Sequence, residues 1–385
     1  MSATADKPLT IAMVAGEASG DNLGAALISE LKTQHPNIRF VGIGGTAMIA
    51  EGFESIQDME RLSVNGFPIM RVPELIKILL STKKAILDSK PDCFIGIDYN
   101  FFNGFLEGMM KRAGLVTVHY VSPTIWAWRS GRIRKIKKHI DLMLTLYPFE
   151  TDIYKTHAIP VQFVGHPKAR EIDLNQGDRD RGPARASLGI DNDELVVAIL
   201  PGSRASEVAL IGPDFFRTAA ILHKELDCKF VIPANNDNRA QQINALWQSL
   251  VPEIPVQITE SSITAMSAAD TVLVKSGTAT LEAMLLRRPM VMSYRLSKPA
   301  YALVSRMVNA DYFALPNILA KSALVPEFIQ DAATPEVLAA AMMEIMSRPQ
   351  EELLSKFAVI HEQLRGDSGA VAATEILQLC YHVSH

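Results

Sequence analysis

A turn of small residues followed by an acid is the part of this sequence best suited to chemistry. The segment Ser276-Gly277-Thr278-Ala279-Thr280-Leu281-Glu282 comes directly after the apolar run 271–275. A turn between a buried strand and a helix leaves backbone N–H groups and the positive helix end facing outward, which suits a pyrophosphate. Glu282 lies about one helical turn further in, where its carboxylate can accept hydrogen bonds from a ribose.

A second glycine turn lies in the same half of the chain. The residues Leu200-Pro201-Gly202-Ser203-Arg204 close the apolar run 195–199 and add a cation. Two turns of this kind predict a nucleotide-diphosphate site.

The first half of the chain places a single acid at the end of another apolar run. Asp98 follows residues 93–97, and the carboxyl ends of parallel strands are where a sheet presents functional groups. Asp98 is therefore a candidate general base. The alternative is a carboxylate that caps the following helix.

Two glycine-containing loops precede Asp98. Gly16-Glu17-Ala18-Ser19-Gly20-Asp21 follows the first apolar run and is either a ligand loop or a plain capped turn. Gly42-Ile43-Gly44-Gly45-Thr46-Ala47 matches the dinucleotide pattern G-x-G-x-x-A. It follows the second strand rather than the first, and its acids, Asp58 and Glu60, come too early, which disfavours NAD binding.

Metal chemistry has little support in the sequence. His119, His139 and His166 have no ligand spacing, and we expect His119 to be buried or to lie behind the site. The Asp-x-Asp triplets at 178–180 and 191–193 are interpreted as solvated loop charges. No metal site is predicted.

The elements that position these residues follow from the hydrophobic pattern, in which apolar runs alternate with helical patterns. This alternation is typical of parallel sheets covered by helices. The expected strands are 9–15, 38–42, 93–97, 116–121, 142–146 and 162–164, then 195–200, 229–232, 256–258, 271–274 and 290–293. Residues 171–193 are polar and predict a loop-like boundary, and the chain from 335 onward is expected to be helical. Two doubly wound α/β domains facing each other across a cleft follow from this order.

Composition narrows the class of protein. A length of 385 residues indicates two domains, and a net charge of −4 gives no reason to expect nucleic-acid binding. The three cysteines are widely spaced, which favours a reducing cytoplasm. Residues 1–8 are short and polar, so no signal peptide is expected, and no run of about 20 apolar residues predicts a membrane span.

One apolar segment has basic neighbours. Residues 67–80 include Phe67, Ile69, Met70, Val72, Leu75, Ile76 and Leu79, with Lys83 and Lys84 behind them. A helix beginning near Pro73 could lie in a membrane interface, and the alternative is a core helix. The basic cluster within 126–139 could bind phosphate headgroups or an anionic substrate, or form a solvated helix face.

Taken together, the motifs resemble the lipid-A-disaccharide synthase family. The matching segments are Val14–Asp21, the run Gly42-Ile43-Gly44-Gly45, the strand ending at Asp98, His119-Tyr120-Val121-Ser122-Pro123, Trp126-Ala127-Trp128, Pro148-Phe149-Glu150, Gly165-His166-Pro167, the Gly202 turn with Glu207, Ser276–Glu282 and Leu315-Pro316-Asn317. They occur in order and at plausible spacing over residues 9 to 330.

This resemblance implies an inverting GT-B glycosyltransferase of two Rossmann-like domains, without a cofactor. Residues 1–170 would bind the acceptor, 171–340 the UDP-sugar, and the helices of 341–385 would pack back on an N-terminal domain. The donor would be UDP-2,3-diacylglucosamine, the acceptor 2,3-diacylglucosamine 1-phosphate, and the product a β-1,6-linked disaccharide 1-phosphate. Because both substrates carry acyl chains, peripheral association with an anionic membrane at the inner face of the inner membrane is expected. A homodimer is left open.

The resemblance also assigns roles to residues. Asp98 would be the base. The donor side would comprise Ser203, Arg204, Glu207, Ser276, Gly277, Thr278, Thr280, Glu282 and Asn317. The acceptor side would comprise Gly16, Glu17, Ser19, Asp21 and His119.

The sequence departs from the family pattern in places. The usual Asp-x-Pro-Asp-Phe-Asn is here Asp98-Tyr99-Asn100-Phe101-Phe102-Asn103, so position 101 has no carboxylate. Val-Met-Gly is replaced by Val64-Asn65-Gly66, and Leu-x-Asp by Lys168-Ala169-Arg170. Another UDP-N-acetylglucosamine enzyme, such as a 2-epimerase, and a non-catalytic nucleotide-sugar-binding protein remain as alternatives.

Overall fold

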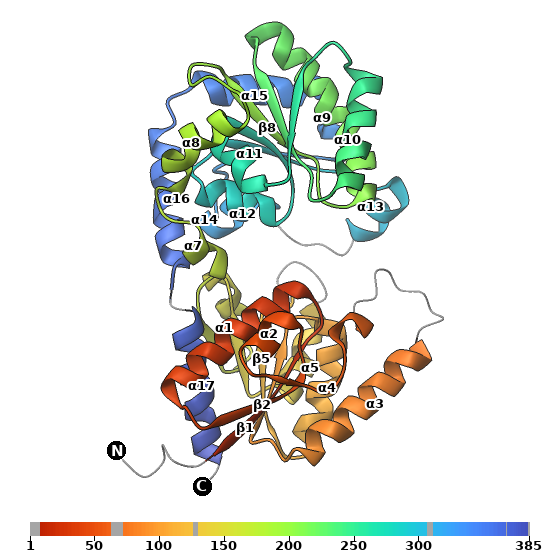
Figure 1. The fold of residues 1–385 in the computed structure, drawn as a ribbon, viewed down its shortest axis with the longest axis vertical. Helices are drawn as coiled ribbons and strands as arrows, with labels where there is room; N and C mark the ends of the chain where they lie inside the picture. The colour runs from red at the N-terminus through yellow and green to blue at the C-terminus, as the bar shows by residue number, and fades with distance from the viewer. Residues whose placement is uncertain (1–7, 63–71, 126–129, 306–310, 367, 384–385) are drawn as a thin grey trace. The chain divides into compact units, whose positions relative to one another are not determined.

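The computed structural model describes residues 8–62, 72–125, 130–305, 311–366 and 368–383 (Figure 1). The chain divides into two compact units. The first unit is Met1–Pro167 with Leu364–His385, and the second unit is Lys168–Gln363.

The first unit contains a seven-stranded parallel sheet in the order β3-β2-β1-β4-β5-β6-β7. Its strands are β1 Leu9–Ala15, β2 Ile38–Ile43, β3 Glu54–Ser55, β4 Cys93–Ile97, β5 Val116–Tyr120, β6 Leu142–Thr145 and β7 Val161–Phe163. The strand order reverses between β1 and β4, and the gap outside the carboxyl ends of such a pair is where α/β sheets bind ligands.

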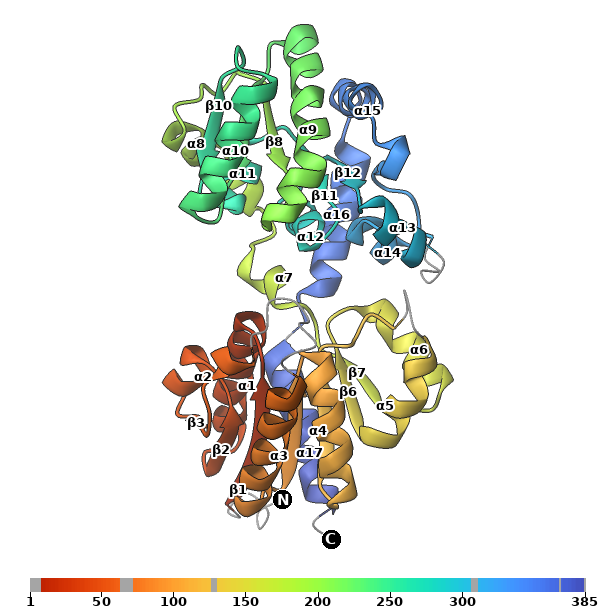
Figure 2. The same ribbon diagram turned by 90° about the vertical axis from the view of Figure 1, so that its right-hand side faces the viewer.

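Helices cover both faces of this sheet (Figure 2). They are α1 Ala18–Gln34, α2 Thr46–Ala50, α3 Val72–Asp88, α4 Asn100–Arg112, α5 Ile133–His139, α6 Thr151–Thr156 and α17 Ser368–Val383. Alternate residues of β1 serve the two faces: Ile11 and Met13 pack with α1 and α17, whereas Ala12 and Val14 pack with α3 and α4. Burial on both faces is the reason that these strands read as nearly continuous apolar runs.

The second unit contains a six-stranded parallel sheet in the order β10-β9-β8-β11-β12-β13. Its strands are β8 Val196–Leu200, β9 Lys229–Pro233, β10 Val256–Thr259, β11 Thr271–Lys275, β12 Met290–Tyr294 and β13 Glu327–Ile329. The order reverses between β8 and β11, so the two glycine turns noted in the sequence follow neighbouring strands at a switch point.

The helices of the second unit follow the same alternation. They are α8 Gln176–Ser187, α9 Ala205–Leu226, α10 Asp237–Leu250, α11 Ser262–Ala268, α12 Thr278–Leu285, α13 Lys298–Val304, α14 Leu315–Ala320, α15 Pro335–Ser347 and α16 Glu351–Leu364, with α7 Pro167–Glu171 at the start of the unit. Short 3-10 turns lie at Met59–Arg61, Ser130–Arg132, Pro148–Glu150 and Gln330–Ala332. Within the C-terminal segment, α15 packs on α9 of the second unit, whereas α17 packs on α1 of the first.

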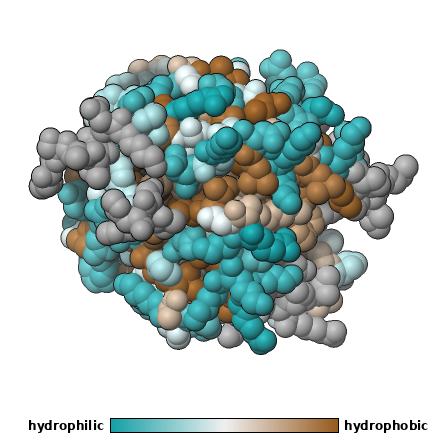
Figure 3. Space-filling view, turned by 90° about the horizontal axis from the view of Figure 1, so that it is seen from below, coloured by the Kyte–Doolittle hydropathy of each residue, from teal (hydrophilic) through white to brown (hydrophobic). Residues whose placement is uncertain are grey.

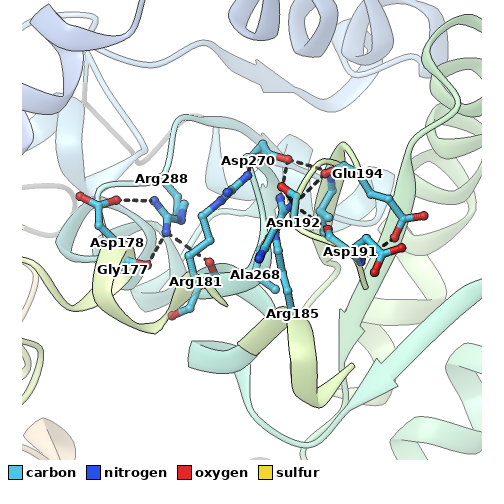
Figure 4. Close-up of polar contacts among 12 residues, drawn as sticks. Gly177, Asp178, Arg181, Arg185, Asp191, Asn192, Glu194, Ala268, Asp270 and Arg288 are labelled. Atoms are coloured by element: carbon cyan, nitrogen blue, oxygen red, sulfur yellow. Dashed lines mark hydrogen bonds and ion pairs between the residues drawn. The ribbon is translucent and has the colours of Figure 1, made fainter. Parts of the chain in front are cut away.

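The polar stretch 171–193 is not the loop that its composition predicts, because it contains α8. Arg185 of α8 is fully buried, and its guanidinium donates to the carbonyl oxygens of Ala268, Asp191, Asn192 and Glu194 (Figure 4). It also pairs with Asp270 at 2.8 Å. A buried cation with this many acceptors fixes α8 to the end of α11 and to the segments that lead into β8 and β11. Composition cannot reveal these partners, since Ala268 and Asp270 are more than 80 residues away.

The carboxylates of the Asp-x-Asp triplets lie at or near the surface, as expected, but the first triplet is part of α8 and not of a loop. Asp178 accepts from Arg288 at 3.2 Å, and Asp180 accepts from Arg179 at 2.8 Å. In the second triplet the backbone carbonyls, not the carboxylates, serve Arg185.

Candidate active site

Asp98 lies at the carboxyl end of β4, next to the end of β1, in a strained turn. Asp98 and Tyr99 both have left-handed backbone conformations, with φ of 47° and 43°. Non-glycine residues adopt this region rarely, and they persist there when the surroundings hold them. The buried Asn103 amide provides that support, donating to the carbonyls of Val14 at 3.1 Å, Ile97 at 3.2 Å and Asp98 at 2.9 Å. The N-cap of α4 is Tyr99, without a side-chain cap bond, so the Asp98 carboxylate does not cap this helix.

The first loop packs directly against this turn. A Cβ at Gly16 would lie 2.4 Å from Cγ of Tyr99, so only glycine allows the ring to approach. The Tyr99 hydroxyl donates to the carbonyl of Leu62 at 2.6 Å. Glu17 and Ser19 of the same loop are exposed.

Asp21, by contrast, was expected to line the acceptor side and does not. Its carboxylate is buried and accepts from the backbone N–H groups of Gly45 at 2.7 Å, Ala47 at 2.9 Å and Met48 at 3.1 Å. These are the orphan donors at the start of α2. Asp21 therefore joins α1 to the glycine turn after β2, and its lone pairs are used within the fold.

His119 of β5 lies behind Asp98 in a buried ion pair. Its Nδ1 is 2.5 Å from Oε1 of Glu107, and its Nε2 is 3.1 Å from Oδ1 of Asn100. Burial alone lowers the pKa of His119, but the Glu107 carboxylate outweighs it, so the pKa is raised above its ordinary value. Sequence reasoning missed Glu107, whose only signal is an acid between the apolar positions Leu106 and Met110 of a helix.

The second unit has a pocket of about 460 Å³ at its switch point. Its lining includes Gly202, Ser203, Arg204, Glu207, Asn235, Glu260, Ser262, Lys275, Ser276, Gly277, Thr278 and Glu282. Seven of the nine residues predicted for the donor side therefore line this one pocket, together with the glycine of the first turn, Gly202. Asn235, Glu260, Ser262 and Lys275 were not predicted.

One wall of this pocket is the start of α12. Gly277 is its N-cap, with φ of 148° and no side-chain cap bond to the helix. The first-turn N–H groups therefore receive no protein carboxylate or hydroxyl as a cap, which leaves a helix start suited to an anion.

Two cations and an acid, Arg204, Lys275 and Glu207, also line the pocket. Glu207 accepts from the N–H groups of Ser203 at 3.1 Å and Arg204 at 3.2 Å, and pairs with Lys275 at 3.0 Å. Burial raises the pKa of Glu207, but the bond from Lys275 and the backbone bond from Arg204 prevail, so the pKa is lowered. Glu207 thus shapes the Gly202 turn, while the Arg204 side chain is 82% exposed and is within reach of a ligand.

Glu282 lies about one turn into α12 and also lines the pocket. Its side chain is 15% exposed, Lys168 Nζ is 3.8 Å away, and Ser262 Oγ donates to it at 3.4 Å. Burial raises the pKa of Glu282 and prevails over Lys168 and Ser262, which act in the opposite direction.

Thr280 and Asn317 were expected to contact the donor, but neither lines the pocket. Thr280 is buried and donates to the carbonyl of Gly277 at 2.8 Å. Asn317 is also buried, and its amide contacts Val325, Glu327 and Leu324 at 2.7 to 2.8 Å. Their polar groups are used to hold α12 and α14 in place.

Part of the expected membrane segment, namely Phe67, Ile69 and Met70, lies outside the described residues, as do Trp126 and Trp128 of the basic cluster. Val72 begins α3. Further along α3, Leu75 and Leu79 are half-buried, and Ile76 and Leu80 are 51% and 53% exposed. The neighbouring α4 exposes Phe101 and Phe105, whose rings meet edge to face at 5.2 Å.

On the face seen in Figure 3, apolar side chains gather near the middle and are bordered by hydrophilic ones. No helix among the described residues is long and apolar enough to cross a membrane. In the same part of the chain, no three His, Cys, Asp or Glu side chains are grouped to hold a metal ion.

Solved structures share this architecture. A UDP-GlcNAc 2-epimerase from Neisseria meningitidis superposes with a TM-score of 0.63 at 14% identity, covering 97% of this chain and 99% of that one. MurG from Acinetobacter baumannii gives a TM-score of 0.58 at 15% identity, covering 97% and 99%. These similarities show the GT-B fold of two parallel-sheet α/β domains.

Sequence comparisons identify the family. The profile described as lipid-A-disaccharide synthetase matches residues 11–373. The lipid-A-disaccharide synthase of Pseudomonas aeruginosa strain UCBPP-PA14 is 45% identical over 375 residues, covering 96% of this chain and 98% of that protein. That of Hahella chejuensis is 45% identical over 388 residues, covering 98% and 96%. Because profile and relatives each span most of the sequence, the chain belongs to the lipid-A-disaccharide synthetase family, whose members are glycosyltransferases of lipid A biosynthesis.

Proposed function

We propose that the protein transfers a diacylglucosamine unit from UDP-2,3-diacylglucosamine to the 6-hydroxyl of 2,3-diacylglucosamine 1-phosphate. The observation that supports donor binding is the pocket of the second unit. Arg204 and Lys275 line it with positive charge, and the start of α12, which has no side-chain cap, adds the positive end of a helix. A helix start together with two cations is suited to binding a diphosphate. Glu282, which also lines the pocket, supplies the acceptor for ribose hydroxyls.

The reaction is a single in-line displacement. The acceptor oxygen forms a bond to the anomeric carbon as the bond from that carbon to the UDP oxygen breaks, which inverts the configuration. Asp98 takes the proton from the attacking hydroxyl, and the charge that develops on UDP is stabilised by Arg204 and α12. One base is sufficient, because no covalent enzyme intermediate has to be hydrolysed.

Acyl chains on both substrates favour work at a membrane surface. The exposed Ile76 and Leu80 of α3 and Phe101 and Phe105 of α4 supply apolar area. The adjoining α5, with Arg134, Lys135 and Lys138 exposed, supplies positive charge for anionic headgroups. These surface features support the part of the proposal in which the protein works as a peripheral protein at the cytoplasmic face of the inner membrane.

A single assay tests the reaction. The protein is incubated with the UDP-diacylglucosamine donor in the presence or absence of the acceptor, and UDP release and the disaccharide product are measured. The proposal expects stoichiometric UDP and disaccharide only when the acceptor is present. Isomerised donor without acceptor would indicate a 2-epimerase, and UDP binding without any turnover would indicate a non-catalytic binding protein.

A further inference from the structure

We infer that Asn100 is a positioning residue for the reaction: it orients the Asp98 carboxylate and is itself oriented by the buried Glu107–His119 pair. This inference rests on the proposed function, because it takes Asp98 as the base. Asn100 is the first residue of α4, two positions after Asp98.

The contacts form a continuous chain. Nδ2 of Asn100 donates to Oδ1 of Asp98 at 3.3 Å, and Oδ1 of Asn100 is 3.1 Å from Nε2 of His119. Nδ1 of His119 is 2.5 Å from Oε1 of Glu107. The His119 and Glu107 side chains are only 3% and 2% exposed, so water does not replace either partner.

The protonation state of His119 determines the orientation of the Asn100 side-chain amide. An ionised Glu107 only accepts, so Nδ1 of His119 carries a hydrogen. When Nε2 also carries one, it donates to Oδ1 of Asn100, and the NH₂ group is left for Asp98. When Nε2 is bare, it becomes an acceptor that competes for the NH₂ group. Rotation of the amide then turns its oxygen toward the Asp98 carboxylate. Two hydrogen-bond acceptors then face each other, and the hydrogen bond to Asp98 is lost.

The surroundings favour the charged imidazole that this orientation needs. Glu107 on α4, Asp98 after β4 and the backbone of Val121 after β5 all act to keep His119 protonated, while burial opposes them. Space for the pair comes from Gly96 of β4, where a Cβ would lie 2.3 Å from Oε1 of Glu107. Both members of the pair, His119 of β5 and Glu107 of α4, are buried and therefore belong to the packed interior of the first unit.

The link is a property of this particular sequence. Asn100 stands where the family pattern has proline, which offers no side-chain donor or acceptor. The same stretch has Phe101 in place of an acid, and the Asn100 amide contacts the Asp98 carboxylate, whereas Asn103 contacts the Asp98 backbone carbonyl.

The test compares kcat and KM for disaccharide formation, across pH, in the wild type and the variants Asn100→Leu, His119→Gln and their double mutant. Losing one hydrogen bond to a charged group predicts a kcat reduced about ten- to a hundredfold in Asn100→Leu, with little change in KM. In the wild type, kcat should fall on the alkaline side as His119 loses its proton, at a pH above the ordinary histidine value. That alkaline limb should be missing in Asn100→Leu.

Non-additivity is the second readout. If His119 acts through Asn100, the double mutant is no slower than Asn100→Leu alone. Additive losses, or an alkaline limb retained in Asn100→Leu, would overturn the inference. Should His119→Gln fail to fold by circular dichroism, the two pH profiles decide alone.

Controls separate this inference from the proposed function. Asn37→Leu removes an exposed amide at the opposite, N-terminal end of the sheet and should match the wild type. UDP affinity should be unchanged in all variants, because the pocket lies in the second unit. If Asn100→Leu is fully active and Asp98→Ala is inactive, only the positioning role of Asn100 is rejected. If Asp98→Ala is active, the assignment of Asp98 as the base is rejected.

Discussion

Glu207 and Lys275 join the two glycine turns of the second unit through an ion pair of 3.0 Å. Glu207 belongs to the first turn of α9, and Lys275 is the last residue of β11. The pair therefore ties the Gly202 turn to the start of α12 and sets the spacing between the two turns that line the pocket. Lys275 also lies 5.4 Å from the ring centroid of Tyr294.

Replacing Lys275 by Met should weaken UDP binding roughly tenfold, because a pocket cation is lost and Glu207 is left without its partner. Isothermal titration with UDP measures this. Lys229→Met, which removes a half-exposed cation paired with Glu194 on the same sheet, is the matched control and should bind UDP normally. Unchanged affinity in Lys275→Met would exclude Lys275 from the donor site.

The same pair gives a pH dependence with a definite sign. Because the pKa of Glu207 is lowered in the folded protein, its ionised form is stabilised there. This contribution is complete above the ordinary glutamate pKa and is lost as the pH falls through the lowered value. Thermal unfolding of the wild type should therefore lose more stability on acidification than that of Glu207→Gln. An equal loss of stability with falling pH in the two proteins would contradict this contribution of Glu207.

Asp98→Ala should reduce kcat by about 10²- to 10⁴-fold, the usual contribution of a general base, with UDP affinity retained. Asp98→Asn keeps the shape and the left-handed turn, and it should be equally inactive. The two variants together distinguish loss of the carboxylate from collapse of the turn. Disaccharide formation and UDP titration are the measurements.

Gly16→Ala should destabilise the first unit by about 1–3 kcal/mol, because the added methyl group overlaps the Tyr99 ring. The displaced ring would carry the Asp98 turn with it, so turnover should also fall. Gly104→Ala is the control: a Cβ there meets nothing within 4 Å, and alanine favours the α4 helix. Chemical denaturation and the disaccharide assay separate the two effects.

Membrane association should depend on the exposed apolar side chains of α3. The double variant Ile76→Ser with Leu80→Ser should sediment less with anionic liposomes at low salt while binding UDP normally. Val359→Ser on α16, which removes a side chain that is 55% exposed, is the control. Equal sedimentation of all three proteins, or insensitivity to salt, would argue against this surface.

Much of the architecture follows from the sequence because buried parallel strands are read directly as apolar runs. Each of the eleven expected strands overlaps a strand of the structure. The short edge strands β3 and β13 were missed, since two or three half-exposed residues leave no apolar run. Helix α8 was missed because its polar composition hides a buried Arg185, two of whose partners, Ala268 and Asp270, lie far along the chain.

The sequence by itself determined the family, the two-domain α/β plan and the strand ends where the glycine turns and Asp98 lie, because these depend on local pattern. Only the tertiary structure decided which polar groups remain available to a ligand. Asp21, Thr280 and Asn317 are used by backbone groups, and Glu107 and His119 are joined beneath Asn100. The physical reason is that a buried hydrogen-bonding group must find a partner, and the fold brings most of those partners from distant parts of the chain.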